Sequence, residues 1–252
     1  MKTLSSVILL ASLLTLLLCH DRVLSYAEPS KHLSAKELKG LEEKGNRGDV
    51  EAIACLFEYY MYEDRKEAVL WARVGDKYAD AKSRYHLGLL LVSSNDARER
   101  EDGIIAWKKS AEQNYFLAQD ELARLYENGK VIKKDLRMAE KWYGSAAMQG
   151  DPSAMRELVR LMTDRAKDIS TLSEAYGWTF LMLKRATSKW SQPVVGKTHD
   201  AQRAIVRRAK DSGVDEKQVL SRAEAWAKKQ DSKVPMSDPM DRQKSRCKYW
   251  EK

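Results

Sequence analysis

Small and apolar residues recur at spacings of four in five separate stretches of this chain. In the third stretch, Ala118, Leu122 and Tyr126 occupy positions i, i+4 and i+8, which lie along one stripe of an α-helix. Each of the other stretches has the same order of positions, so each predicts a helix that buries this stripe. The five sets are Ala52-Leu56-Tyr60, Ser83-Leu87-Leu91, Ala118-Leu122-Tyr126, Ala154-Leu158-Met162 and Ala201-Ile205-Ala209.

A tryptophan follows each of these helices at a regular distance. The steps between Trp71, Trp107, Trp142, Trp178 and Trp226 are 36, 35, 36 and 48 residues. A period of this length predicts stacked helix–turn–helix units, in which the tryptophans act as structural wedges between helices rather than as binding residues. We therefore expect an all-α fold, a right-handed α-solenoid of about five antiparallel helix pairs.

The third unit carries the most specific motif. It contains Ala118, Leu122, Tyr126, Gly129, Asp135, the run Ala139-Glu-Lys-Trp-Tyr143 and Gly150. This pattern resembles the Sel1-like repeat of the tetratricopeptide-like class. The resemblance extends over residues 46–230 with degenerate neighbouring units, and it implies a scaffold or adaptor that binds other proteins.

The chain before the array predicts an export signal in residues 1–27. Met1-Lys2 is a basic start, Val7 to Leu18 is apolar and small, and Ser25-Tyr26-Ala27 offers a small-x-small cleavage site. This apolar run is shorter than the roughly 20 residues that span a bilayer. We expect a periplasmic or secreted protein with no integral membrane span after cleavage. An uncleaved anchor, or a lipoprotein attached at Cys19, is the alternative.

The remaining chain divides into three parts. Residues 28–45 are expected to form a lead-in helix, and residues 46–230 the repeat array. The long step between the last two tryptophans places an insertion at residues 188–199, which includes Trp190. It is a functional surface loop, a neutral surface loop, or an extension of the second helix of the fourth unit that carries Trp190. Residues 231–252 contain two prolines and many charges, and we expect a flexible basic tail.

The charge of the chain is basic but mixed. It carries 45 Lys and Arg against 37 Asp and Glu, a formal net charge of +8. No nucleic-acid recognition motif occurs, and an exported protein seldom meets nucleic acid, so we expect no nucleic-acid partner. The basic excess gathers in residues 203–252, with 14 basic against 8 acidic residues. This asymmetry favours a partner with an acidic surface.

Two cysteines, Cys55 and Cys247, remain once the signal is removed. They are either a buried thiol and an exposed thiol, or a disulfide that ties the tail to the first repeat in an oxidising compartment.

The sequence contains no recognised catalytic motif. A Gly-x-Ser-x-Gly elbow, a His-Glu-x-x-His zinc site and a phosphate-binding glycine loop are all missing. We expect no catalytic residue, no cofactor and no metal, and we interpret His86 as a packing residue or a groove residue. Some relatives associated with β-lactam binding carry a cysteine pair in every repeat, and this chain does not, so a β-lactam hydrolase-like enzyme is the weak alternative.

The predicted binding surface is the concave groove formed by the first helix of each pair. Arginines there suit bidentate capture of carboxylates on a partner, although they could equally make solvated i, i+4 contacts. The predicted groove residues are Tyr85, Leu89, Arg124, Arg156, Arg160, Arg203 and Arg207.

The sequence as a whole indicates an exported module that binds another protein through this groove. One concrete role is an immunity protein that neutralises a toxic secreted effector. A periplasmic scaffold in envelope signalling, or a virulence factor that binds a host protein, fits the same features.

Overall fold

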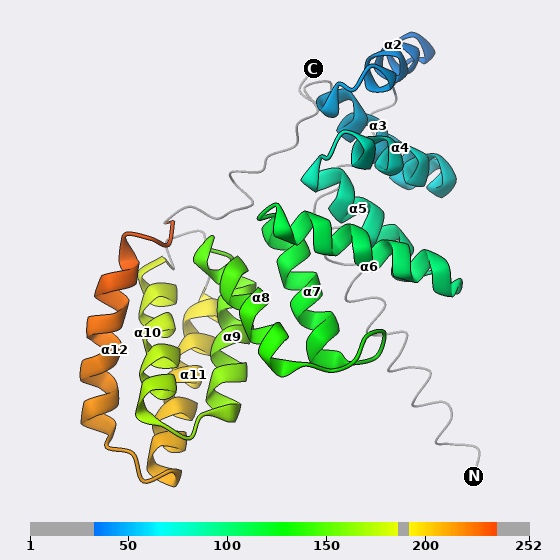
Figure 1. Ribbon diagram of the computed structural model, residues 1–252. Coiled ribbons are helices and arrows are strands. Elements are labelled where there is room, and N and C mark those ends of the chain that lie inside the picture. Colours follow the sequence, from blue (N-terminus) through cyan, green and yellow to red (C-terminus); the bar gives the residue numbers. More distant parts are fainter. Residues whose placement is uncertain (1–32, 186–191, 236–252) are drawn as a thin grey trace.

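A computed structural model describes residues 33–185 and 192–235 of the chain (Figure 1). The export signal, Trp190 and the tail from residue 236 onward lie outside the described residues. The described part is all-helical and contains no strand. Its helices are α2 (Ala35–Asn46), α3 (Val50–Glu63), α4 (Arg65–Lys77), α5 (Ala81–Leu91), α6 (Ala97–Glu112), α7 (Phe116–Asn128), α8 (Leu136–Met148), α9 (Pro152–Arg165), α10 (Ile169–Arg185), α11 (Gln192–Asp211) and α12 (Glu216–Asp231).

Local sequence sets where most of these helices begin. Seven of them follow an aspartate whose carboxylate accepts a hydrogen bond from a backbone N–H of the first turn. Helix α2 begins with a capping box, in which the side chains of Ser34 and Glu37 each accept a hydrogen bond from the other's backbone N–H. Between α8 and α9 the turn passes through Gly150 at a φ of 89°, a conformation that favours glycine.

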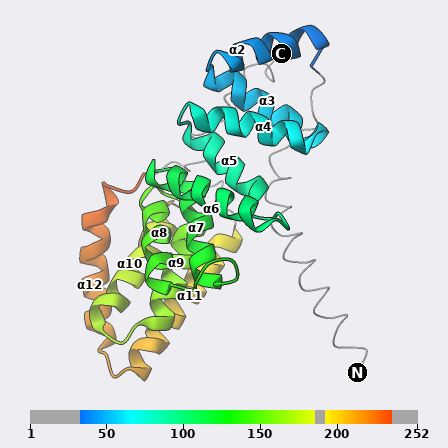
Figure 2. The ribbon, with the colours of Figure 1, turned by 45° about the vertical axis from the view of Figure 1, so that its right-hand side comes forward.

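The helices stack in the predicted order. The pairs α3/α4, α5/α6 and α7/α8 pack as hairpins, and each second helix then packs against the first helix of the next pair. Figures 1 and 2 agree that α2 to α6 lie at one end of the molecule and α9 to α12 at the other. The described chain is therefore an α-solenoid of five successive helix pairs, preceded by α2, as the tryptophan period predicts.

Tryptophan rings fill gaps between helices along the stack. A β-carbon at Gly88 of α5 would overlap the Trp107 ring, whose Nε1 donates a hydrogen bond of 2.9 Å to the Tyr85 carbonyl. At the first pair, a β-carbon on Gly45 would lie 2.7 Å from the Trp71 ring. These rings are buried, as the interpretation of the tryptophans as wedges predicts.

The last pair departs from the regular stacking. Helix α12 packs mainly against α10 and makes few contacts with α11, its neighbour in sequence. Helix α12 packs there because Gly177 leaves space on α10 for the Trp226 ring. The centroids of the Trp226 and Trp178 rings are 5.1 Å apart. Helix α10 thus lies between α11 and α12, so the two helices of the fifth pair pack on α10 more than on each other.

Two segments differ from the sequence-based expectation. Residues 192–199, expected in an insertion loop, belong to α11, which has 20 residues where the other first helices have 11 to 14. Residues 231–235, expected in a flexible tail, pack against the core: Val234 is 2% exposed. The buried Arg185 guanidinium donates to the carbonyls of Asp231, Val234 and Pro235, which would otherwise lack donors at the end of the helix.

The packing of Trp226 on α10 generates a test with a matched control. A β-carbon at Gly177 would lie 2.5 Å from the Trp226 ring, whereas one at Gly144, also inside a helix, meets nothing within 4 Å. We expect Gly177→Ala to destabilise the protein by about 1–3 kcal/mol through overpacking. Gly144→Ala should stabilise it by about 0.5–1 kcal/mol through helix propensity. Urea unfolding measures both, and equal effects would refute this packing.

Candidate protein-binding surface

The first helices α3, α5, α7, α9 and α11 follow one another along one side of the array, which we name the first-helix face. Contacts across it link successive first helices directly. Lys82 of α5 bonds Glu58 of α3 at 2.9 Å, and Arg160 of α9 bonds Glu127 of α7. In stacked helix pairs this is the side that presents an extended binding surface.

The arginines predicted on this face are engaged with neighbouring side chains. Arg124 pairs with Asp120, which is 3% exposed, at 3.2 Å. Its guanidinium also lies 3.5 Å from the Ser153 hydroxyl of α9. Arg156 donates to the same hydroxyl and to Glu157, each at 3.3 Å. Arg124 therefore connects α7 to α9, Arg156 is held within α9, and neither is an isolated cation.

Arg160 is the centre of this ion-pair network. It pairs with Glu127 of α7, with Glu157 at 3.0 Å and with Asp164 at 3.4 Å. Glu127 in turn accepts a hydrogen bond of 2.9 Å from the Tyr143 hydroxyl of α8. Three helices are joined through one carboxylate, so the network is more than the solvated i, i+4 contacts weighed from the sequence.

The network shifts the pKa values of its members. Burial alone would raise the pKa of Glu157, but the hydrogen bond from Arg160 and the charges of Arg156 and Arg160 outweigh it, so that pKa lies below its usual range. Burial, followed by the charge of Glu127, raises the pKa of Tyr143. At neutral pH Glu157 is therefore ionised and Tyr143 is a neutral donor.

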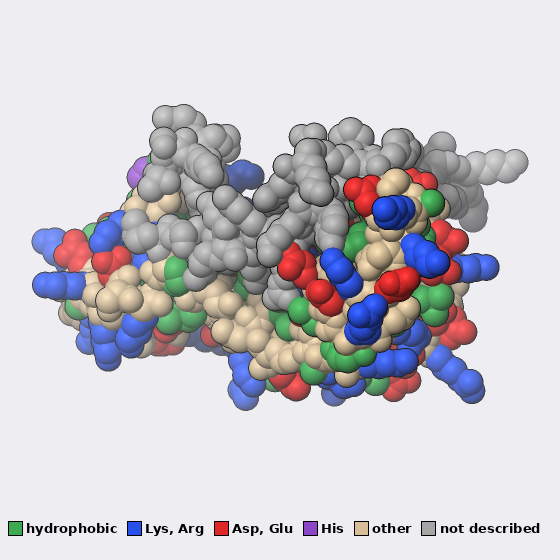
Figure 3. Space-filling model, turned by 90° about the horizontal axis from the view of Figure 1, so that it is seen from above, with side chains coloured by type: hydrophobic (Ala, Val, Ile, Leu, Met, Phe, Trp, Pro, Cys, Tyr) green, Lys and Arg blue, Asp and Glu red, His purple; other side chains and the backbone are tan. Residues whose placement is uncertain are grey.

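The other predicted site residues fall in different environments. Tyr85 is 9% exposed and packs against the Tyr115 ring at 5.3 Å, so it belongs largely to the core. Leu89 is half-buried beside that cluster. Arg203 is exposed and pairs with Asp200, and Arg207 is exposed and makes no ion pair with a described residue. Figure 3 shows basic and acidic side chains interspersed at the end of the molecule formed by α10 to α12.

Sequence reasoning missed one row of this face. Three residues after the small residue of the first four of these helices come Cys55, His86, Glu121 and Glu157, whereas the fifth has Ala204 at this position. The signal was available, because polar residues at a constant offset from a buried stripe mark a shared helix face.

His86 and Cys55 are the unusual members of this row. The His86 ring stacks on Phe57 with centroids 4.1 Å apart, and neither ring nitrogen has a hydrogen-bond partner within the described residues. Burial, with the nearby charge of Lys82, lowers the pKa of His86 well below its usual value. Cys55 is fully buried and disulfide-bonded. The other two cysteines, Cys19 and Cys247, lie outside the described residues, so the pairing predicted from the sequence remains a prediction.

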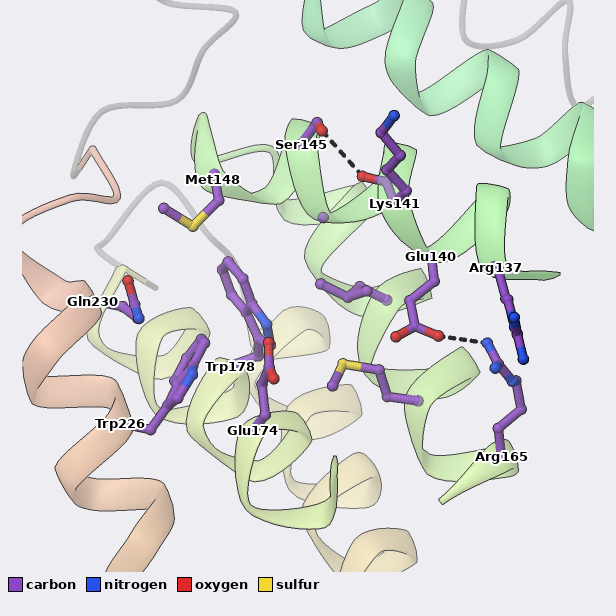
Figure 4. Close-up of a pocket in the computed structure, with 13 residues that line it drawn as sticks. Arg137, Glu140, Lys141, Ser145, Met148, Arg165, Glu174, Trp178, Trp226 and Gln230 are labelled. Atoms are coloured by element: carbon purple, nitrogen blue, oxygen red, sulfur yellow. Dashed lines mark hydrogen bonds and ion pairs between the residues drawn. The ribbon is translucent and has the colours of Figure 1, made fainter. Parts of the chain in front are cut away.

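A hollow separate from the first-helix face lies between α8, α9, α10 and α12. It has a volume of about 570 Å³ and is lined by the indoles of Trp178 and Trp226 (Figure 4). Burial, followed by the charge of Glu140, raises the pKa of Glu174 on its wall, and Glu140 itself pairs with Arg165 at 2.5 Å. The Trp178 indole offsets part of this shift, although its Nε1 makes no hydrogen bond of normal geometry with a described residue. The hollow lies beside the contact between Gly177 of α10 and Trp226 of α12.

Residues 33–185 and 192–235 lack two further features. No cluster of three or more His, Cys, Asp or Glu side chains there is arranged to hold a metal ion. No helix in these ranges combines the length and the apolar character needed to cross a bilayer.

Comparison with solved structures identifies the fold. A protective antigen of uropathogenic Escherichia coli strains, described as displaying an SLR fold, superposes with a TM-score of 0.61 at 20% identity, over 79% of this chain and 41% of that chain. A Sel1 repeat protein from Oxalobacter formigenes has 26% identity over 49% of this chain and 97% of that chain, with a TM-score of 0.42. No protein-family model and no curated protein matches the chain. The chain therefore has the Sel1-like repeat fold that its third unit indicates.

The depressed pKa of Glu157 predicts how stability depends on pH. A lowered pKa in the folded state stabilises the protein above the unfolded value of about 4.3, and this contribution is lost as pH falls through the folded pKa. We expect Glu157→Gln to cost about 1–3 kcal/mol at pH 7, as for a hydrogen bond to a charged group. Below pH 4 the gap to wild type should shrink. Urea midpoints across pH measure this, and Glu224→Gln, exposed on α12, is the control that should show neither effect.

Proposed function

We propose that this protein is a binding module that engages a partner protein through the C-terminal half of its first-helix face. The observation that carries the proposal is a row of arginines at equivalent positions on three successive first helices of a Sel1-like solenoid. Repeat arrays of this kind present extended surfaces to other proteins. The five arginines are Arg124, Arg156, Arg160, Arg203 and Arg207.

The ion pairs refine which of these arginines contribute most to recognition. Arg124, Arg156 and Arg160 are already held by carboxylates of α7 and α9, so they form an ordered, nearly charge-balanced surface. Ordering before binding lowers the entropy cost of association. Arg203 and Arg207 project from α11, the last first helix, whose outer face no later first helix covers. They are the groups best placed to meet carboxylates of a partner.

The charge of this end supports an acidic partner. Residues 192–235 contain ten Lys and Arg against six Asp and Glu. Complementary charge speeds encounter with an acidic surface and disfavours basic competitors.

More specifically, we propose that the protein is exported to a bacterial periplasm, where it neutralises a toxic secreted effector. The basic start and apolar run at the N-terminus support export, and the ordered charged face suits masking of an acidic site on another protein. A periplasmic scaffold in envelope signalling would use the same face and is the competing role.

Charge reversal on α11 tests the binding surface. We expect Arg203→Glu with Arg207→Glu to weaken partner binding at least tenfold, which corresponds to about 1.4 kcal/mol. Lys217→Glu with Arg222→Glu is the matched control, because both residues are exposed on α12 and the change in charge is equal. The partner is first captured from an envelope extract by cross-linking, and its dissociation constant is then measured for each variant. Equal losses in both variants, with helicity retained, would refute the surface.

Co-expression distinguishes immunity from scaffolding. We expect the chain, secreted together with a toxic effector encoded beside it, to restore growth, and the Arg203→Glu/Arg207→Glu variant to fail. Cell fractionation of the same strains should place the chain outside the cytoplasm. If growth is not restored and only structural or signalling proteins are captured, the immunity role is wrong and the scaffold role stands.

A further inference from the structure

Cys55 lies on α3 in the core cluster that includes Leu41 and Leu56, and its sulfur is disulfide-bonded. It lies on α3 in register with Glu51, Glu58 and Tyr62, at offsets of −4, +3 and +7, so these side chains share one face. Tyr62 is 43% exposed and both glutamates retain exposure. Cys55, in their midst, is fully buried and disulfide-bonded. The partner cysteine is therefore Cys19 or Cys247, the other cysteines of the chain.

The next first helix shows a related feature. His86 occupies on α5 the position that Cys55 occupies on α3. Both of its ring nitrogens are shielded from solvent, and within the described residues neither has a hydrogen-bond partner. Buried polar atoms of native proteins normally have partners, so His86 independently indicates an additional group on this part of the face.

Sequence and reach identify the occupant. The other cysteines of the chain are Cys19, inside the predicted export signal, and Cys247. Twelve residues separate Pro235, the last one described, from Cys247, and an extended chain of this length spans about 40 Å. This span equals about four interaxial distances of packed helices, so the tail can extend well beyond α12, the helix that it follows.

Charge favours the same segment. Four of the seven residues from 242 to 248 are basic and none is acidic, and Tyr249 and Trp250 follow. The face around Cys55 carries the partly exposed Glu51 and Glu58, of which Glu58 also pairs with Lys82, and the exposed ring of Tyr62. Basic and aromatic groups on an extended segment therefore meet acidic and aromatic groups on α3.

We propose that residues 236–252 of this chain occupy the N-terminal half of the first-helix face, over α3 and α5, and are secured there by a Cys55–Cys247 disulfide. The bond forms by exchange with an external disulfide. One cysteine thiolate attacks it and releases one thiol, and the second cysteine then displaces the other thiol, so two protein thiols are oxidised and one disulfide is reduced. The tail is thus an intramolecular occupant, and a partner that needs α3 or α5 gains access only after reduction. This regulatory consequence rests on the proposed function, whereas the docking does not.

Peptide mapping without reduction tests the linkage in the full chain. Cleavage after Lys and Arg should join the peptide Gly48–Arg65 to Cys247-Lys248. Linkage of Gly48–Arg65 to the peptide that contains Cys19, or a free Cys55 thiol after isolation from an oxidising compartment, would overturn the proposal.

Histidine modification tests the docking separately from the linkage. With diethyl pyrocarbonate, His86 should be protected at least fivefold in the oxidised chain relative to Cys247→Ser, while the exposed His199 reacts equally in both as an internal control. Cys19→Ser should behave like the oxidised chain. Unchanged protection of His86 in Cys247→Ser would show that the tail does not line this face, even if the disulfide is found. Neither measurement involves a partner, so each can fail independently of the proposed function.

Discussion

The fold depends on the close approach of large aromatic rings to small residues between successive helices. A solenoid has no central core, and each helix pair is stabilised only by its neighbours. Trp71 and Trp107 fill spaces left by Gly45 and Gly88, and Trp226 fills the space left by Gly177. Because each such contact sets the distance between two helices, the stack transmits its geometry from one unit to the next.

The charged side chains of the first-helix face contribute to this stacking. Lys82 with Glu58 and Arg160 with Glu127 cross from one first helix to the next. Partly exposed pairs of this kind contribute modestly to stability one by one, but a shared network orders several long side chains at once. The result is a face whose charges are already positioned, so a partner meets a defined pattern rather than mobile arginines.

The two ends of the array differ for physical reasons. At the C-terminal end, α10 is packed by α9, α11 and α12 together, and Arg185 satisfies the carbonyls that follow α12. This cluster buries the longest continuous core of the described chain. At the N-terminal end the core divides into smaller clusters among α2 to α6.

The sequence by itself determined the number, order and approximate limits of the helix pairs and the structural role of the tryptophans. These features depend on short-range patterns: stripes at i, i+4 and i+8, and aspartates at helix starts. Only the tertiary structure decided that α12 packs on α10, that residues 192–199 extend α11, and that Arg185 anchors residues 231–235. It also showed that Arg124 and Arg156 pair with carboxylates of their own helices, whereas Arg160 pairs with Glu127 across helices. Such contacts join residues up to 50 positions apart, and their distances follow from how whole helices pack rather than from any local pattern.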